Sequence, residues 1–237
     1  MEKRAVILAG GKGTRLRPYT AVLPKPLMPI GEYPILEIVI RQLAKHGFNR
    51  ITLAVNHQAE LIQAFFGDGS KWNINIDYSM EDKPLSTMAP LKLIQDLPGD
   101  FLVMNGDVLT DLDFSGFFRY HVQNRNIFTI SAFEREVKIE YGVLEENPRG
   151  RLKGFREKPV LKYRVSMGIY IVNKSIIDFI PDDRPYGFDH LMNDLIAKGS
   201  PASLKLHSGL WLDIGSPDDY SAAVDVFERN RDSILGE

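Results

Sequence analysis

Three glycines in four residues follow a short apolar run near the start of the chain, within the stretch ILAGGKGTRLRPYT. Glycine has no Cβ, so a loop of Gly10, Gly11 and Gly13 can turn its backbone N–H groups inward around an anion, and phosphate is the usual one. The spacing does not fit the P-loop, because Gly13 stands where Ser or Thr should follow Gly-Lys, or the dinucleotide fingerprint, because Leu16 replaces its third glycine. A tight strand-to-helix turn is the plain alternative.

Cations surround this glycine loop in a chain whose formal net charge is -2. Four of them fall within fourteen positions, namely Lys12, Arg15, Arg17 and Lys25. Lys25 lies between two prolines in LPKPLMP, and both restrict the backbone beside it. A solvated charged surface would explain the cluster, but a lysine held this rigidly favours the neutralisation of a bound anion.

Two aspartates follow apolar runs where a parallel sheet would present them at its carboxyl edge. Asp107 ends DFLVMNGD, and Asp213 lies in WLDIG. Magnesium prefers oxygen ligands and often takes only one or two carboxylates, with phosphates and water completing its shell. Each aspartate alone fits a turn equally well.

These residues need a scaffold, and strand-like and helix-like segments alternate in the manner of parallel β-α-β units. The expected strands are residues 6–8, 50–55, 73–78 and 100–107, and the expected helices are residues 35–47 and 59–66. Gly47 is placed to end the first helix. After Asp107 the chain is mostly strand-like, which predicts antiparallel or mixed pairing. A last helix is expected from Ser216-Pro217, with serine as its cap.

The composition is that of an ordinary globular protein, with 44% hydrophobic and 25% charged residues in 237. We expect a single domain over residues 1–237. The net charge excludes the broad basic field that captures nucleic acid or anionic membranes. The chain has no cysteine, no signal peptide pattern and no apolar run approaching the roughly 20 residues of a membrane span, so we expect a cytoplasmic protein.

The glycine loop and the lysine segment together resemble the signature of the sugar-1-phosphate nucleotidylyltransferases, which make nucleotide sugars and release pyrophosphate. Five further motifs follow in the order of that family, namely YSMEDKPLST, VMNGDVL, YGVLEENPRGRLKGFREKP, MGIYIV and WLDIGSPDDY. The resemblance implies an α/β, Rossmann-like domain of the nucleotide-diphospho-sugar transferase type, with a mixed, mostly parallel sheet flanked by helices and no C-terminal β-helix. It implies Mg²⁺ as the cofactor, and a nucleoside triphosphate and a sugar 1-phosphate as the substrates.

The same resemblance implies roles for individual residues. The implied catalytic residues are Arg15, Lys25 and Lys158, and the implied metal ligands are Asp107 and Asp213. The implied nucleotide-binding residues are Leu8, Ala9, Gly10, Gly11, Gly13, Thr14, Glu81, Ser86, Thr87 and Asn105. The implied sugar-binding residues are Gly142, Glu157, Ser166 and Gly168.

Two positions depart from the family pattern. Relatives usually place Gly-Thr-Ala-Gly where this chain has Ser86-Thr87-Met88-Ala89, and the added Cβ atoms leave the geometry of the base pocket open. Ser166 replaces a common asparagine, and its shorter side chain leaves room for a bulkier or differently hydroxylated sugar.

The sequence favours GTP as the nucleotide. The Glu81 carboxylate only accepts hydrogen bonds, which suits the adjacent N1–H and N2–H donors of guanine better than uracil or thymine. The PLKLI that follows resembles mannose 1-phosphate and manno-heptose 1-phosphate guanylyltransferases. Thymidylyl, uridylyl or cytidylyl transfer, a non-catalytic regulator that binds a nucleotide sugar, and the guanylyltransferase of molybdenum cofactor assembly remain alternatives.

Two aromatic pairs occupy apolar positions of expected helices, Phe65-Phe66 and Phe117-Phe118. They indicate core packing or a subunit contact, which leaves a homodimer open.

Overall fold

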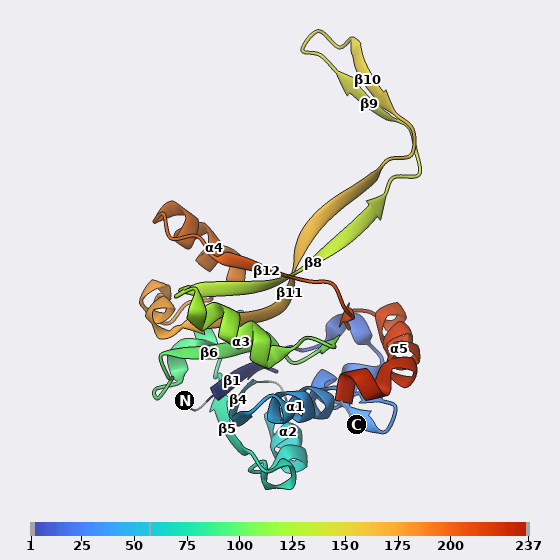
Figure 1. Ribbon diagram of the computed structural model, residues 1–237. Helices are drawn as coiled ribbons and strands as arrows, with labels where there is room; N and C mark the ends of the chain where they lie inside the picture. Colours follow the sequence, from blue (N-terminus) through green and yellow to red (C-terminus); the bar gives the residue numbers. More distant parts are fainter. Residues whose placement is uncertain (1–2, 57, 236–237) are drawn as a thin grey trace.

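A seven-stranded sheet with helices on both faces organises the computed structural model, which describes residues 3–56 and 58–235 (Figure 1). The strands are β1 (Lys3–Leu8), β2 (Pro29–Ile30), β3 (Tyr33–Pro34), β4 (Phe48–Val55), β5 (Asn75–Met80), β6 (Asp100–Asn105), β7 (Val108–Thr110), β8 (Phe128–Lys138), β9 (Val143–Glu146), β10 (Leu152–Arg156), β11 (Val160–Asn173), β12 (Ser203–His207) and β13 (Trp211–Asp213). The helices are α1 (Ile35–Lys45), α2 (Ala59–Phe66), α3 (Phe114–Gln123), α4 (Phe188–Ala197) and α5 (Pro217–Leu235). Short 3₁₀ turns are η1 (Thr14–Leu16), η2 (Tyr19–Ala21), η3 (Lys25–Leu27), η4 (Ser70–Trp72), η5 (Ala89–Leu93) and η6 (Lys174–Phe179).

The main sheet is mixed and mostly parallel, as expected. Its strand order is β12-β8-β11-β6-β1-β4-β5. The pairs β1–β4, β1–β6, β4–β5 and β8–β12 are parallel, and β11 runs antiparallel to both β6 and β8. The parallel strands β1, β4, β5 and β6 therefore end at a common carboxyl edge, which is where α/β sheets bind ligands. The described residues contain no β-helix.

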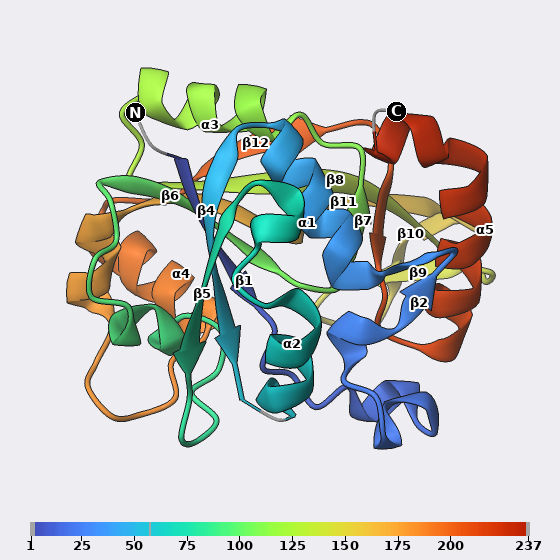
Figure 2. The same ribbon diagram turned by 90° about the horizontal axis from the view of Figure 1, so that it is seen from below.

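Apolar side chains from both faces of the sheet close the core. The helices α1, α2 and α3 cover one face, and α4 and η5 cover the other (Figure 2). A third cluster packs α5 against the segment that follows the glycine loop, and it includes Phe227, Leu16 and Met28. Because full burial of such a side chain contributes about 1.5–3 kcal/mol, α5 anchors this segment to the body.

Most of the expected elements are confirmed. The helix α1 ends at Lys45, and Gly47 follows it with a φ of 79°. The strand β5 begins two residues later than expected, because Asn73 adopts a left-handed φ of 55°. Ser216 does cap α5, since its Oγ accepts a hydrogen bond from the backbone of Asp219 at 3.3 Å. Of the aromatic pairs, Phe66, Phe117 and Phe118 are buried and Phe65 is 44% exposed, so they mainly pack the core.

The strands β8 and β11 continue beyond the sheet as a two-stranded ribbon, and the hairpin β9–β10 extends that ribbon further from the body (Figure 1). We refer to residues 134–164, which form this projection, as the arm. The arm begins at the carboxyl edge of the parallel strands, because β11 enters the sheet antiparallel to β6.

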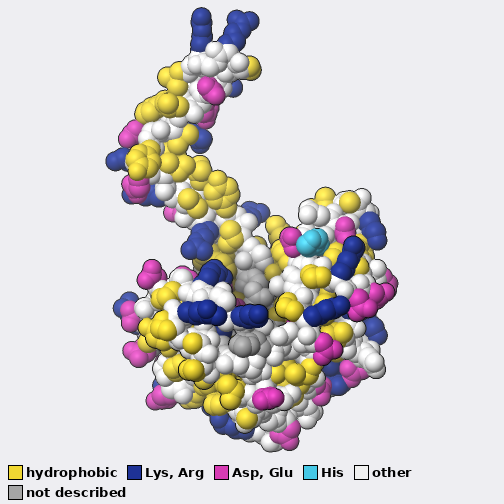
Figure 3. Space-filling model, turned by 180° about the vertical axis from the view of Figure 1, so that it is seen from behind, with side chains coloured by type: hydrophobic (Ala, Val, Ile, Leu, Met, Phe, Trp, Pro, Cys, Tyr) yellow, Lys and Arg dark blue, Asp and Glu magenta, His cyan; other side chains and the backbone are white. Residues whose placement is uncertain are grey.

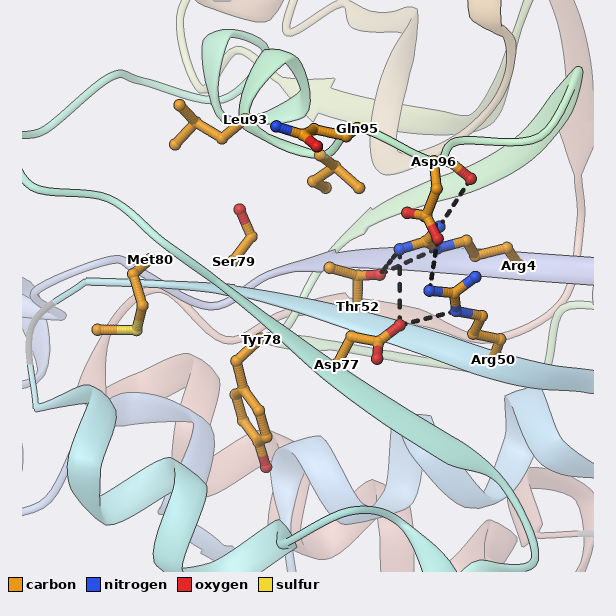
Figure 4. A pocket seen from close by; sticks show the side chains of 11 residues that line it. Arg4, Arg50, Thr52, Asp77, Tyr78, Ser79, Met80, Leu93, Gln95 and Asp96 are labelled. Carbon is orange, nitrogen blue, oxygen red and sulfur yellow. Dashed lines mark hydrogen bonds and ion pairs between the residues drawn. The ribbon is translucent and has the colours of Figure 1, made fainter.

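Four charged side chains form an ion-pair network that links three neighbouring strands of the sheet to the segment before β6 (Figure 4). Arg4, which is 3% exposed, donates to Asp96 at 2.7 Å and to the Thr52 hydroxyl at 2.7 Å. Arg50 contacts Asp96 at 2.6 Å and Asp77 at 2.7 Å. The two arginines and two aspartates neutralise one another beside a cavity of about 420 Å³, so this network joins β1, β4 and β5 to the segment before β6.

We predict that this network stabilises the fold only above strongly acid pH. The hydrogen bond from Arg4 is the main cause that lowers the pKa of Asp96 from 3.8 to about 2. Because the pKa is lower in the folded chain than in the unfolded one, the stabilisation is complete above pH 3.8 and is lost as the pH falls through about 2. The urea midpoint of Asp96→Asn should lie below that of the wild type at neutral pH, and the gap should narrow in acid.

The matched control is Asp82→Asn, which removes an exposed aspartate that makes no ion pair within the described part of the chain. A gap between wild type and Asp96→Asn that stays constant down to pH 2 would contradict the prediction.

Candidate functional site

A cleft of about 510 Å³ opens at the carboxyl edge of β1, β4, β5 and β6. The predicted nucleotide-binding residues that line it are Leu8, Gly10, Gly11, Glu81, Ser86, Thr87 and Asn105, and Asp107 lies among them. It is also lined by Lys12, Asn56, Pro84 and Leu85, which were not predicted to bind the nucleotide. Ala9, Gly13 and Thr14 were predicted there but do not line the cleft. The sheet therefore assembles most of the predicted nucleotide residues from segments far apart in the sequence.

The glycines of the loop have different structural tasks. A Cβ on Gly10 would lie 3.2 Å from both Asn56 and Glu81, so glycine here lets β1 approach the ends of β4 and β5. Gly13 has a φ of 58°, and a Cβ on it would lie 3.0 Å from Thr20 and 3.1 Å from Lys25. Gly13 therefore allows the loop to pack closely against Thr20 and Lys25, and it does not line the cleft.

Lys25 and Asp107 meet at the cleft although 82 residues separate them. Lys25 opens η3 directly after Pro24, and its side chain is 11% exposed. Its Nζ forms an ion pair with Asp107 Oδ2. Since the lysine backbone is held by η3 and its stem is buried, the ammonium group is fixed at the end of β6.

Asp213 lies beside this ion pair. The strand β13 pairs with β7 so that Asp213 is opposite Val108, and the backbone N–H of Ile214 donates to the Asp107 carbonyl at 3.2 Å. Burial, and then the negative charge of Asp107, raise the pKa of Asp213, whereas Lys25 and Arg15 act in the opposite direction. Two acids and two cations thus share one region.

The predicted catalytic residue Arg15 is held by a close approach of the backbone. A Cβ on Gly215 would lie 3.2 Å from Arg15 Nη1, so the absence of a side chain there makes room for the guanidinium group. The sequence pattern WLDIG therefore supplies both an acid and the space for a cation.

The pair of Asp107 and Asp213 fits a divalent cation. Asp107 Oδ1 is buried and has no hydrogen-bond partner, which leaves a carboxylate oxygen available to a ligand. Within residues 3–56 and 58–235, no group of three or more His, Cys, Asp or Glu side chains is arranged to hold a metal ion. A cation at this pair would need phosphate or water oxygens as well, as Mg²⁺ commonly does.

Glu81 lines the same cleft close to Gly10. Its Oε2 accepts a hydrogen bond from the backbone N–H of Leu85 at 3.2 Å, and burial raises the pKa of its carboxyl group. Asn56 donates to the Glu81 carbonyl at 2.9 Å and thereby fixes the turn that carries it. Asn56 had a signal in the sequence, because it is the first polar residue after the buried strand ITLAV.

The departure at Ser86 leaves the loop in the conformation that glycine favours. Ser86 has a φ of 69°, which costs a residue with a Cβ about 1–2 kcal/mol. The adjacent Thr87 hydroxyl accepts a hydrogen bond from the backbone of Phe188 at 2.9 Å and so caps α4. The serine thus keeps the left-handed turn, and the threonine ties this loop to a helix.

Ser166 and Gly168 join Asn105 at the β11 side of the cleft. Gly168 has a φ of 72°, and a Cβ on it would lie 2.6 Å from Asn105 Nδ2. Ser166 Oγ accepts from the Gly168 N–H and donates to the Tyr170 hydroxyl, each at 3.2 Å. Gly168 is therefore packed against Asn105, which lines the cleft, and Ser166 is hydrogen-bonded to Gly168.

Gly142, Glu157 and Lys158 lie on the arm instead. A Cβ on Gly142 would lie 2.6 Å from the Phe155 ring and 3.2 Å from Glu157 Oε2, so these residues are neighbours. The extended strand β11 separates them from Ser166 by at least six residues, which is roughly 20 Å at 3.3 Å per residue. The structure does not bring them to the cleft of their own chain.

A glycine loop, a fixed lysine and two aspartates lie at the carboxyl edge of a mostly parallel sheet, an arrangement that is typical of α/β proteins that bind phosphate groups. The profile of the family described as Nucleotidyl transferase matches residues 4–230. The chain belongs to this family.

The curated relatives are named for the transfer of two different nucleotidyl groups. The chain is 37% identical over 233 residues to the mannose-1-phosphate guanyltransferase of Yarrowia lipolytica, covering 94% of this chain and 64% of that protein. It is 35% identical over 241 residues to the UTP--glucose-1-phosphate uridylyltransferase of Synechocystis sp., covering 93% and 62%. The chain thus spans slightly less than two thirds of the length of these relatives.

Solved structures share the fold. HddC from Yersinia pseudotuberculosis complexed with GMP-PN has a TM-score of 0.73 at 28% identity, with coverage of 95% of this chain and 99% of that one. A putative glucose-1-phosphate thymidylyltransferase from Bacillus anthracis has a TM-score of 0.76 at 22% identity, with coverage of 94% of both chains. None of the helices in the described residues is both long enough and apolar enough to span a bilayer.

We predict that a methyl group at Gly13 destabilises the lysine segment. Gly13→Ala strains a left-handed backbone and crowds Thr20 and Lys25, so the free energy of unfolding should fall by about 1–3 kcal/mol in a urea titration. Gly11→Ala is the matched control, since a Cβ there meets nothing within 4 Å. Equal stability of the two variants would contradict this account of the loop.

Proposed function

We propose that the protein transfers a nucleotidyl group from a nucleoside triphosphate to a sugar 1-phosphate and releases pyrophosphate. The observation that carries the proposal is the convergence of Lys25, Asp107 and Asp213 from three separate segments, beside the cleft that Asp107 lines. Membership of the Nucleotidyl transferase family and the names of the relatives support it.

The reaction requires two anionic reactants to meet. A phosphate oxygen of the sugar 1-phosphate attacks the α-phosphorus, and the bond from that phosphorus to the bridging oxygen of the β-phosphate breaks. Two like unit charges about 4 Å apart repel by roughly 4 kcal/mol at an effective dielectric of 20, so the site must supply positive charge. Lys25 and Arg15 provide it, and the rigid η3 turn keeps the ammonium group aligned for in-line attack.

We propose Mg²⁺ as the cofactor, and members of the family generally use divalent metal ions. Asp107 and Asp213 would hold it, with the unpartnered Asp107 Oδ1 as one oxygen ligand. When bound, the ion neutralises phosphate charge and orients the triphosphate. The Lys25 ammonium group, which pairs with Oδ2 of the same carboxylate, would hold Asp107 in this orientation.

We propose GTP as the nucleotide and a sugar 1-phosphate of the manno or manno-heptose type as the acceptor. Glu81 lines the cleft, and its carboxyl oxygens could accept hydrogen bonds from the paired N–H donors of guanine. The Yarrowia relative and the HddC complex with GMP-PN support guanine, whereas the Synechocystis relative is named for UTP. A direct comparison of the rates with different nucleoside triphosphates therefore decides between guanylyl and uridylyl transfer.

We predict a preference for GTP that depends on Glu81. Pyrophosphate release should be fastest with GTP among GTP, ATP, CTP, UTP and dTTP when mannose or manno-heptose 1-phosphate is supplied. Glu81→Gln turns one acceptor oxygen into a donor, so kcat/KM for GTP should fall by about ten- to a hundredfold. Asp82→Asn, a change in the exposed neighbour, should alter it little. A strong preference for a pyrimidine nucleotide would overturn the guanylyl assignment, and binding without turnover would indicate a regulator.

We predict that Lys25→Ala lowers the turnover number by about a hundredfold or more, because a positive charge aimed at the reacting phosphates is worth about 3–4 kcal/mol. Lys71→Ala, at a side chain that is 60% exposed on another face, is the control. Turnover should be measured as pyrophosphate release over a range of Mg²⁺ concentrations. Near-normal turnover of a folded Lys25→Ala enzyme would remove this residue from the mechanism.

A further inference from the structure

The strand that carries Asp213 is very short. β13 pairs antiparallel with β7 over three residues, which set Trp211 opposite Thr110 and Asp213 opposite Val108. A two-stranded ladder of this kind is marginally stable alone in water. Because side chains alternate across a strand, a slip of one residue would turn the Asp213 side chain to the opposite face, away from Asp107. Contacts outside the ladder are therefore needed to fix its register.

The two ends of β13 are held in different ways. Beyond Asp213, the backbone N–H of Ile214 donates to the Asp107 carbonyl at 3.2 Å. Before Trp211, residues 208–210 form a turn that joins β13 to β12, which belongs to the main sheet. The position of Asp213 thus depends on how this turn is attached to the body.

Asp111, the residue after β7, binds this turn with its side chain and its backbone. Asp111 Oδ1 accepts a hydrogen bond from the Leu210 N–H at 2.7 Å, and the Asp111 N–H donates to the Leu210 carbonyl at 3.3 Å. The Thr110 hydroxyl donates to the same carbonyl at 2.7 Å. Leu210 and Asp111 follow the pair of Trp211 and Thr110 in the ladder, so these hydrogen bonds set its register.

His207, the last residue of β12, completes the attachment. Its Nε2 lies 2.9 Å from Asp111 Oδ1 and 3.2 Å from the Leu210 carbonyl oxygen. Because both of these oxygens are acceptors, Nε2 carries a proton and donates. The side chains of His207 and Asp111 are 13% and 29% exposed, so their contact is partly shielded from solvent. This contact joins the main sheet to the end of β7.

Gly209 lets the turn close over the Asp111 carboxyl group. A Cβ on Gly209 would overlap Asp111 Oδ1 and would lie 2.8 Å from both Asp111 Oδ2 and His207 Cε1. Any side chain at this position would therefore displace the carboxyl group or the imidazole ring. The segment HSGLW supplies a donor and also the space for its acceptor.

A second contact acts on β13 from the root of the arm. The arm stands away from the body (Figure 3), and at its root the centroids of the Phe133 and Trp211 rings are 5.4 Å apart. His207 is the partner of Phe133 in the parallel ladder of β8 and β12. His207 therefore connects the root of the arm, the main sheet and the end of β7.

We propose that Asp111 and His207 are positioning residues, which fix Asp213 beside Asp107 and thereby set the affinity of these two acids for a divalent cation. Neither Asp111 nor His207 is among the residues that line the cleft, so they act through β13. The proposal rests on the proposed function, because that function assigns Mg²⁺ to Asp107 and Asp213.

Tb³⁺ provides a test that needs neither nucleotide nor sugar. Like Mg²⁺ it is a hard cation that takes oxygen ligands, and it emits light when a nearby tryptophan is excited. Trp211 lies two residues before Asp213 on the same face of β13. Asp213→Asn should abolish the emission of the wild type. Emission that Asp213→Asn leaves unchanged, or a wild type that binds no Tb³⁺, would overturn the proposal.

Two variants break the contact between Asp111 and His207, and two matched variants keep it. Gly209→Ala and His207→Ala should raise the Tb³⁺ concentration at half-maximal emission by about tenfold, as is common when a metal ligand loses its supporting contacts. His207→Gln should stay near the wild type, because its amide nitrogen can replace Nε2 as the donor. Gly99→Ala is the control for the change of glycine to alanine, since a Cβ there meets nothing within 4 Å.

Stability measurements separate positioning from a purely structural role. If the folded variants Gly209→Ala and His207→Ala had lower urea midpoints but bound Tb³⁺ as tightly as the wild type, the positioning role would be wrong. Circular dichroism confirms that both variants are folded.

The catalysed reaction gives a second readout. The Mg²⁺ concentration at half-maximal pyrophosphate release should rise about tenfold in the same two variants. A wild type that binds Tb³⁺ at Asp213 but releases no pyrophosphate would contradict the proposed function, whereas the Tb³⁺ titrations would still decide the role of Asp111 and His207.

Discussion

In the proposed reaction, the repulsion between phosphate groups is the main physical constraint on the site. A cleft that accepts a triphosphate beside a second phosphate must hold cations in place before the reactants arrive, because mobile charges would lose entropy on binding. The ion pair of Lys25 with Asp107 meets this requirement. The ion pair fixes the position of the Lys25 ammonium group. It also leaves Asp107 with one unpartnered carboxylate oxygen close to Asp213.

Several parts of the fold keep that arrangement in place. Gly13 lets the chain pass close behind Lys25, and Gly215 leaves space for Arg15. The helix α5 buries Phe227 against the segment that connects the glycine loop to α1. The charges in the cleft are thus positioned by apolar packing and close backbone contacts, so the core and the site are parts of one structure.

The arm meets the body of the protein at the strand that carries one of the two acids. At the root of the arm, the Phe133 ring packs against Trp211 with 5.4 Å between the ring centroids, and Trp211 lies in β13 together with Asp213. Packing at the root of the arm therefore helps to position β13 beside β7.

The sequence by itself determined most of the helices and strands, and it predicted many of the residues that line the cleft. The helical spacing of apolar residues predicted α1 and α2, and the Ser-Pro pair predicted the cap of α5. Asp107 and Asn56 are polar residues that follow buried strands, and both line the cleft, although only Asp107 was predicted. Only the tertiary structure decided which of these groups meet. The register of β7 and β13 sets Asp213 beside Asp107, and the extension of β11 beyond the sheet carries Glu157 and Lys158 away from Ser166. Strand pairing between distant segments and the direction of a ribbon depend on contacts that no local pattern encodes, and for that reason they could not be predicted from the sequence.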